Sequence, residues 1–258
     1  MRIGLDINKS LEANASLYYD KAKKAKKKLE GAQGAIDRTI KKIGALKEKK
    51  DEMLQSDTTI MTQPQKKEWF EKFRWFLTST KFLVIGGRDA TTNEIVIKKH
   101  TDPHDIVMHT DMAGSPFFVI KSEGKEIDKQ TLKEVADACC SFSRAWKLGL
   151  STQQVFYVKP DQVTKQANPG EYLAKGAFMI RGKTNYIENN INCAIGMTKK
   201  GKIMAGPLEA IKEHCKEYLV VSQGDQKSSD IAKKIKAKVG GELDDIIRAL
   251  PSGGINLE

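Results

Sequence analysis

Three of the four histidines fall within ten residues of one another and alternate with aspartates. The cluster consists of His100, Asp102, His104, Asp105, His109 and Asp111. Imidazole and carboxylate groups are common ligands of divalent metals, so the cluster could hold an ion that assists hydrolysis. Strand alternation would place Asp105, His109 and Asp111 on one face. The first half of the cluster surrounds Pro103 in an expected turn and has no recognised ligand spacing. We therefore predict no metal and no cofactor, and keep a metal-assisted RNA-processing enzyme as an alternative.

Two further motifs also give no catalytic prediction. Ser115 follows Ala113 and Gly114 but lacks the G-x-S-x-G frame of a nucleophile elbow. Gly86-Gly87-Arg88 lacks the spacing of a P-loop, and we expect no helix directly after it. The sequence thus predicts a chain without catalytic residues.

Basic side chains mixed with tyrosines point to a different chemistry, the binding of RNA. Cations contact phosphates and exposed aromatic rings stack on bases. The candidate contacts are Arg88, Lys98, Lys99, His109, Arg144, Lys159, Lys165, Arg181 and Lys183, interleaved with Tyr157, Tyr172 and Tyr186. For any one of them an ordinary surface charge is the simpler interpretation, so the prediction depends on the group.

A second basic region lies between Asp20 and Lys50, where twelve Lys and Arg accompany only four Asp and Glu. The candidate RNA contacts here are Lys23, Lys24, Lys27 and Lys28. The solvated face of an ordinary coiled coil is the alternative, but such faces normally mix both signs. The excess of lysine therefore favours a surface that faces phosphates.

The composition of the whole chain agrees with a polyanionic partner. Its 258 residues carry 44 Lys and Arg against 33 Asp and Glu, a formal net charge of +11. This balance favours RNA, DNA or an acidic membrane surface, although lysine can also serve solubility alone. The four cysteines form no C-x-x-C pair, which indicates a reducing compartment. No apolar run approaches the roughly 18 residues of a membrane span, so we predict a cytoplasmic protein that does not bind membranes.

A seam of small and apolar residues predicts a helical arm at the start of the chain. From Leu11 to Met53 such residues recur in steps of four and three, the period of a coiled coil. Many are alanine, which permits a close approach of a partner helix. Three glycines, Gly31, Gly34 and Gly44, weaken the expectation of one unbroken helix.

We expect this arm to be an antiparallel hairpin. The returning helix is predicted over residues 65–77, because Trp69, Phe70, Phe73 and Phe76 would form one apolar face. The polar residues 55–63 would form the turn. Self-association through the seam, and with it a coiled-coil interaction scaffold, is the alternative.

After Thr80 the pattern changes to short strands separated by turns. The expected strands are 82–85, 94–98, 105–110, 117–121, 154–159, 178–181 and 218–221. Helices are expected from Asp128 to a stop at Gly149, over 228–238 and over 242–249. Strands grouped around a helix predict an α+β fold with a mostly antiparallel sheet. The predicted division is an arm over 1–78 and a compact domain over 79–258.

Several stretches of the compact domain closely resemble the NFACT RNA-binding domain. They are KFRWFLTSTKFLVIGGRDATTNEIVIKKH, DIVMHTDMAGSPFFVIK, FSRAWKLG, VFYVKPDQVTKQANPGEYLAKGAFMIRGKTNY and LPSGG. Upstream, NKSLEANASLYYDKAKKAKKKLEGA is similar to the start of the coiled coil in this family. The short coiled coil and compact ending are most similar to archaeal members.

The resemblance implies a role in ribosome-associated quality control. Members of this family recognise a large ribosomal subunit that still carries peptidyl-tRNA, and some recruit tRNA to extend the stalled chain; bacterial relatives have also been called fibronectin-binding proteins. The expected partners are therefore the large ribosomal subunit and its rRNA, with tRNA as a further candidate. Full-length members begin with an N-terminal domain and a helix-hairpin-helix region that have no counterpart here. The chain is thus expected to be the second half of such a protein or a short form. Ser79-Thr80-Lys81 also departs from the glycine turn that relatives often carry.

Overall fold

The computed structural model describes residues 4–56, 67–168 and 170–258, with side chains outside 45–56. The chain divides into two compact units, Met1–Lys66 and Lys67–Glu258. We describe each unit by itself.

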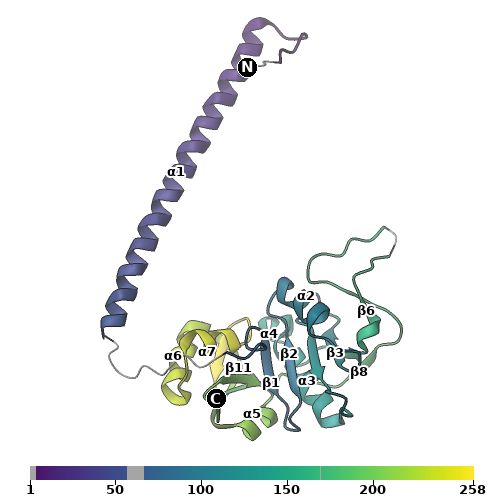
Figure 1. Cartoon of the computed structure of the whole chain (residues 1–258). Coiled ribbons are helices and arrows are strands. Elements are labelled where there is room, and N and C mark those ends of the chain that lie inside the picture. The colour runs from purple at the N-terminus through teal and green to yellow at the C-terminus, as the bar shows by residue number, and fades with distance from the viewer. Residues whose placement is uncertain (1–3, 57–66, 169) are drawn as a thin grey trace. The chain divides into compact units, whose positions relative to one another are not determined.

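The first unit is dominated by one long helix, α1 (Leu11–Ser56), shown in purple and blue in Figure 1. Its 46 residues correspond to roughly 70 Å of helix. The Ser10 hydroxyl accepts a hydrogen bond from the Ala13 amide at 3.2 Å and so caps the helix. The glycines expected to interrupt the helix lie within it. The predicted turn over 55–63 falls largely outside the described residues.

In its described residues, the second unit contains twelve strands. They are β1 (Arg74–Leu77), β2 (Leu83–Gly86), β3 (Ile106–Thr110), β4 (Phe118–Lys121), β5 (Val155–Val158), β6 (Val163–Thr164), β7 (Met179–Ile180), β8 (Asn185–Ile187), β9 (Ala194–Thr198), β10 (Ile203–Gly206), β11 (Cys215–Gln226) and β12 (Ile255–Leu257). Its helices are α2 (Ala90–Lys99), α3 (Lys129–Ser141), α4 (Arg144–Leu148), α5 (Leu208–His214), α6 (Ser228–Val239) and α7 (Leu243–Ala249), with a 3-10 turn over Pro160–Gln162.

The strands form a six-stranded sheet, a four-stranded sheet and a small hairpin. The order is β1-β2-β4-β3-β5-β8 in the first and β10-β9-β11-β12 in the second, while β6 pairs with β7. All paired strands are antiparallel. The α+β fold class predicted from the sequence is confirmed.

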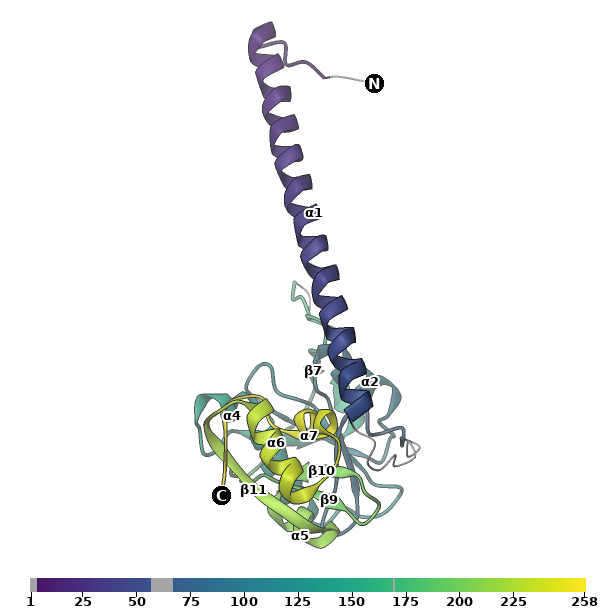
Figure 2. The ribbon, with the colours of Figure 1, turned by 90° about the vertical axis from the view of Figure 1, so that its left-hand side faces the viewer.

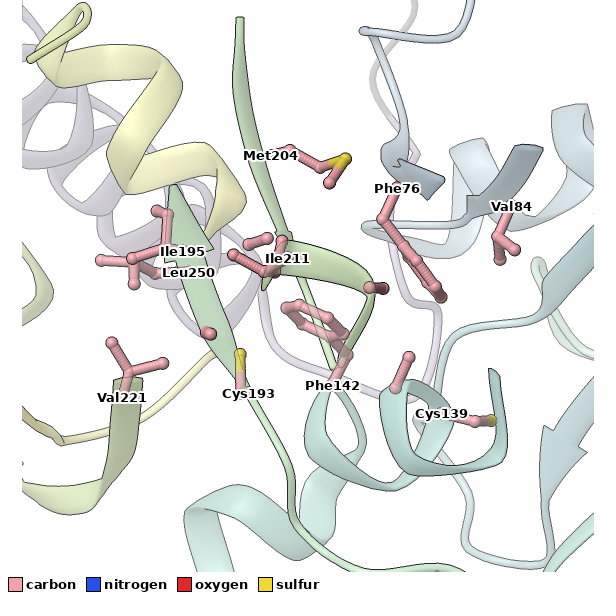
Figure 3. Close-up of a cluster of buried hydrophobic side chains, with 14 of the residues drawn as sticks. Phe76, Val84, Cys139, Phe142, Cys193, Ile195, Met204, Ile211, Val221 and Leu250 are labelled. Atoms are coloured by element: carbon pink, nitrogen blue, oxygen red, sulfur yellow. The ribbon is translucent and has the colours of Figure 1, made fainter. Parts of the chain in front are cut away.

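Both faces of the six-stranded sheet are buried. Successive residues of a strand point to opposite faces, so Phe118 enters one hydrophobic cluster and Val119 the other. The larger cluster includes α3 and the second sheet, and Figure 3 shows Phe76, Ile195 and Met204 within it. The smaller cluster includes residues of α2 and of the β6-β7 hairpin.

The second sheet carries the C-terminal helices. α6 packs on β11 and α7 on β10, and the two helices lie side by side in Figure 2. β12 pairs with β11 through Leu257 and Val221. All four cysteines are buried and free.

The predicted returning helix over 65–77 is wrong. Residues 74–77 form β1, and its pairing with β2 makes this segment part of the compact unit. Phe73 and Phe76 are both buried, but they belong to different clusters on the two faces of the sheet. The aromatic residues therefore fill two cores instead of one helical face. The division between the two units lies at Lys66 and Lys67.

The predicted strand over 94–98 is also wrong, since these residues belong to α2. Asp89 caps this helix by accepting a hydrogen bond from the Thr92 amide at 2.8 Å, and the Thr92 hydroxyl completes a capping box. Gly86-Gly87-Arg88 is thus followed by a helix, contrary to our expectation. In the β1-β2 turn Lys81 has a φ of 72°, a conformation that glycine adopts more readily.

Other elements match their predictions. α3 begins after its cap Asp128, and α6 and α7 lie where they were expected. The single helix predicted from Asp128 to Gly149 is wrong in one respect, because it is interrupted at Phe142 and Ser143 and forms two helices, α3 and α4. The predicted stop is confirmed, since α4 is capped by Gly149 with a φ of 70°. β6, β8, β9, β10, β12 and α5 were not predicted.

Candidate nucleic-acid interface

A basic cleft of about 560 Å³ opens at one end of the six-stranded sheet. The strand register explains its position, because Arg74 at the start of β1 pairs with Gly86 at the end of β2, and Gly86 pairs with Phe118 at the start of β4. Five Lys and Arg line it: Arg74, Arg88, Arg144, Lys147 and Lys175. Among the described residues that line the cleft, Asp89 is the single carboxylate.

Arg74 lies deepest among these cations. Its Nη1 donates a hydrogen bond to the Leu250 carbonyl at 3.0 Å, and its guanidinium lies 4.6 Å from the centre of the Phe142 ring. Burial lowers the pKa of Arg74 to about 10, and the nearby charge of Arg88 acts in the same direction. The group remains protonated at neutral pH.

Arg88 lies directly before the capped start of α2. Its Nη2 donates to the Arg248 carbonyl. Burial, followed by the charge of Arg248, lowers the pKa of Arg88, while Asp245 and Asp89 oppose this. Gly87 is required beside it, because a Cβ there would lie 1.7 Å from Oδ1 of the buried Asn93.

Asn93 ties two walls of the cleft together. Its Oδ1 accepts a hydrogen bond from the Phe117 amide at 3.1 Å, which fixes the loop over 113–117 to α2.

Two further cations of the cleft, Arg144 and Lys147, come from α4. The cap of this helix, Ser143, accepts a hydrogen bond from the Ala145 amide at 3.0 Å. Both basic side chains are exposed at the rim.

The loop over 174–178 forms another wall and is held against α2. The Gly176 amide donates to Glu94 at 3.2 Å, and Lys165 forms an ion pair with the same carboxylate at 2.8 Å. Hydrogen bonds from Lys165, Gly176 and Lys98 lower the pKa of Glu94 to about 2. A Cβ at Gly176 would lie 2.5 Å from the Ala90 Cα, and its φ is 81°. The wall therefore approaches the helix as closely as a glycine permits.

His109 lies at the aromatic side of the cleft. Its ring stacks on Phe117 with centroids 4.0 Å apart, and its Nε2 donates to the Ser115 carbonyl at 3.1 Å. Burial lowers the pKa of His109. The imidazole is thus neutral at physiological pH and acts as a donor to the loop.

The cleft brings together three of the predicted contacts, Arg88, His109 and Arg144. Lys98 and Lys165 both pair with Glu94. Lys99 is exposed at the end of α2.

A further group surrounds Gln162. The side-chain amide of Gln162 donates to the carbonyls of Arg181 and Lys183 at 2.8 and 2.9 Å, and its Oε1 accepts the Lys159 amide. Lys159, Arg181 and Lys183 are exposed, so these cations form a separate basic surface by the 3-10 turn.

In the first unit, the candidates Lys23, Lys24, Lys27 and Lys28 are exposed on α1. Within the described part of the chain none of them forms an ion pair. Lys23 and Lys41 are eighteen residues apart, which is five turns of an α-helix, so they lie on the same side.

The histidine and aspartate cluster is dispersed in the fold. Asp102 and Asp105 both bind the Lys121 ammonium, and His100 stacks on Trp69 at 4.7 Å. Asp111 accepts the Tyr186 hydroxyl at 3.2 Å. No group of three or more His, Cys, Asp or Glu in the described residues could hold a metal.

Three cations of the cleft were not among the contacts predicted from the sequence: Arg74, Lys147 and Lys175. Arg74 was assigned to the wrong element, and its neighbours in the cleft come from distant parts of the chain. FSRAWKLG contained both Arg144 and Lys147, so the spacing of three on a short helix was an available signal.

Comparison with known proteins identifies the domain around this cleft. Residues 72–182 match the NFACT protein RNA binding domain, which includes β1 to β7 and most of the cleft. This part of the chain is an NFACT RNA binding domain. An archaeal Rqc2 homolog, aRqcH of Methanocaldococcus jannaschii, is 41% identical over 200 residues, which are 75% of this chain and 30% of that protein.

Other NFACT relatives are similar over the same part. The human ribosome quality control complex subunit NEMF is 40% identical over 177 residues, which are 68% of this chain and 16% of that protein. The chain thus spans less than a third of the length of these two relatives. The solved C-terminal part of the fibronectin/fibrinogen-binding protein from Streptococcus suis aligns with a TM-score of 0.39 at 16% identity, covering 69% of this chain and 76% of that one. No helix in the described residues has the length and hydropathy of a membrane span.

Proposed function

We propose that this NFACT chain is a non-catalytic RNA-binding module of a ribosome-associated quality control factor. Its partner is the rRNA of the large ribosomal subunit, with tRNA on stalled complexes as a further ligand. The observation that supports this best is the cleft, in which five Lys and Arg accompany one carboxylate within an NFACT RNA binding domain. The names of the relatives, which refer to ribosome quality control, support the cellular role.

Two surfaces would contact RNA in different ways. The lysines of α1 are long, exposed and unpaired in the described structure, which suits contact with phosphates along a duplex. The cleft is concave and holds arginines in fixed positions, which suits planar, bidentate recognition of a phosphate. Lys159, Arg181 and Lys183 extend the basic surface of the compact unit.

Binding of the full chain to purified large subunits and to an rRNA transcript tests this proposal. We expect log affinity to fall with log salt, by about 0.9 for each phosphate neutralised on a duplex and about 0.7 on a single strand. Replacing Lys23, Lys24, Lys27 and Lys28 by Gln should weaken binding about tenfold and reduce the salt slope by up to about 3.6. The Arg144→Gln/Lys147→Gln variant should weaken binding with a smaller change in slope.

The matched control is Lys125→Gln/Lys129→Gln, which removes two exposed charges outside the cleft. Lys129 is the first residue of α3 and lies roughly 20 Å along the helix axis from Phe142, and Lys125 lies in the loop before it. It should bind like the unmodified chain, and the RNA should be recovered intact. Binding that is insensitive to salt, or equal losses in the control, would contradict the proposal. RNA cleavage that His109→Ala abolishes would favour the metal-assisted enzyme instead.

A further inference from the structure

The two innermost cations of the cleft are held in place without a counter-ion. Arg74 and Arg88 each donate to a backbone carbonyl, that of Leu250 and that of Arg248. The ring of Phe142 supports Arg74 from one side. A carbonyl group fixes the orientation of a guanidinium but leaves its full charge in place. The remaining N–H groups are therefore pre-positioned for an anion.

Nearby carboxylates are engaged elsewhere. Asp89 caps α2 through the Thr92 amide and hydroxyl, and Asp245 binds Lys67 at 3.3 Å. Among the described residues, none of the five cations of the cleft forms an ion pair. The lowered pKa values of Arg74 and Arg88 have the same origin, since both groups are partly desolvated beside another arginine. An anion that enters the cleft would relieve this repulsion.

Three segments of the chain form the walls of the cleft around the two arginines. Walls come from the loop over 113–117, from the α3-α4 junction over 142–147 and from the loop over 174–178. Asn93 and Glu94 of α2 fix the first and the last of these walls. Two of the three walls are therefore fixed to α2.

The charge of the cleft favours a phosphate monoester over a phosphodiester. A phosphate monoester carries about −1.5 to −2 charges at neutral pH and three strong acceptor oxygens, whereas a phosphodiester carries a single charge. Two adjacent guanidinium groups match a dianion in charge, and each can bind two of its oxygens.

We propose that the cleft binds the terminal phosphate monoester of an RNA strand, with Arg74 and Arg88 against the phosphate oxygens and Arg144, Lys147 and Lys175 around its entrance. The RNA part of this inference rests on the proposed function. The monoester chemistry is common to 5′ and 3′ phosphates, and the experiment separates these two sources.

The test compares the affinity of the full chain for versions of one short single-stranded RNA with an internal fluorophore. One version has hydroxyl groups at both ends, one has a 5′ phosphate and one a 3′ phosphate. A fourth has hydroxyl ends and two additional nucleotides, which supply extra charge without a monoester. We expect one phosphorylated version to bind about tenfold or more tightly than the dihydroxyl RNA, as charge-assisted hydrogen bonds predict. The lengthened RNA should bind within about twofold of the dihydroxyl RNA.

Variants locate the effect in the cleft. Arg88→Met keeps much of the side-chain volume, and the exposed Arg144→Gln poses little risk to folding; both should reduce the preference for the phosphorylated end. Lys129→Gln, outside the cleft, should retain the full preference. Equal affinity for all four RNAs would overturn the inference while leaving RNA binding intact, whereas absence of any RNA binding would overturn the proposed function.

A second measurement tests the site without RNA. Cytidine 5′-monophosphate or cytidine 3′-monophosphate should raise the melting temperature of the chain, while cytidine should not. The Arg88→Met variant should lose this shift and Lys129→Gln should keep it. A shift that is equal for cytidine, or unchanged in Arg88→Met, would contradict a phosphate site at these arginines.

Discussion

The lysines of α1 and the arginines of the cleft carry the same sign of charge in opposite settings. The lysines are exposed and lie at intervals along a helix, so solvent screens them and their side chains remain free to move. Arg74 and Arg88 are partly buried and anchored on carbonyl groups of a distant segment. The first setting suits affinity for many phosphates, and the second suits selection of one.

The same contrast between an exposed helix and a packed domain should appear in stability, where we expect the largest effect. Phe76 is fully buried between the sheets, whereas Ile36 of α1 is 52% exposed. Phe76→Ala should lower the free energy of unfolding of the compact unit by about 3–5 kcal/mol. Ile36→Ala should change stability by about 0.5 kcal/mol or less. Chemical denaturation followed by tryptophan fluorescence and circular dichroism measures both.

Measuring stability at several protein concentrations tests whether α1 pairs with a second chain. If the seam of α1 pairs with a second chain, the effect of Ile36→Ala should grow with concentration, and the mass in solution should fall in the variant. A large and concentration-independent loss in Ile36→Ala would instead contradict the exposure of this seam.

Replacing two glycines by alanine, one in each unit, should change stability in opposite directions. A Cβ at Gly176 would overlap the backbone of Ala90, and the residue has a φ of 81°. Gly176→Ala should therefore destabilise the compact unit by about 1–3 kcal/mol and weaken phosphate binding as the wall shifts. Gly31 in α1 has nothing within 4 Å, so Gly31→Ala should increase helix content and stabilise α1 by about 0.5–1 kcal/mol. Circular dichroism and thermal melts test both, and a neutral Gly176→Ala would show that the loop does not pack as described.

The smallest effect concerns two histidines, one in the cleft and one exposed. The pKa of His109 is lowered in the folded state by burial, so the unfolded chain binds a proton more readily. Stability should therefore be unaffected by this group well above its ordinary value of about 6.5 and decrease as pH falls below it. His109→Gln should reduce the loss between neutral and mildly acidic pH by about 1 kcal/mol or less. His104→Gln, at an exposed position, should leave the loss of stability unchanged. An equal change in both variants would contradict the assignment of the pH dependence to His109.

Local signals predicted part of the fold. Asp128 marks the start of α3, and the short apolar runs of β3, β4 and β5 are visible in the sequence. The arm was recognised from its period, although the predicted hairpin was wrong. The fold class followed from the grouping of these elements.

The failures have a common physical origin in long-range contacts. Trp69, Phe73 and Phe76 fit one helical face in the sequence, but residues 69–73 form a turn, and pairing with β2 makes residues 74–77 a strand. The β-branched residues Ile95, Val96 and Ile97 favour a strand locally, but the capping box at Asp89 and burial of Val96 select a helix. Three positions of the cleft, Arg88, His109 and Arg144, were predicted because they belong to the basic side chains that are interleaved with tyrosines. The cleft itself was not predicted, because the segments that form its walls are far apart in the sequence.

The hydrogen bond from Arg74 to the Leu250 carbonyl joins residues that are 176 positions apart. Arg74 begins β1, the first strand of the compact unit, and Leu250 follows α7, its last helix. Such a contact closes a very long loop and is expected to form late during folding. The cleft is therefore assembled only when both edges of the unit have docked. Fraying of α7 or β12 would release the guanidinium of Arg74 before the central strands lost their structure, so a partly unfolded chain would retain its charge and lose its selectivity.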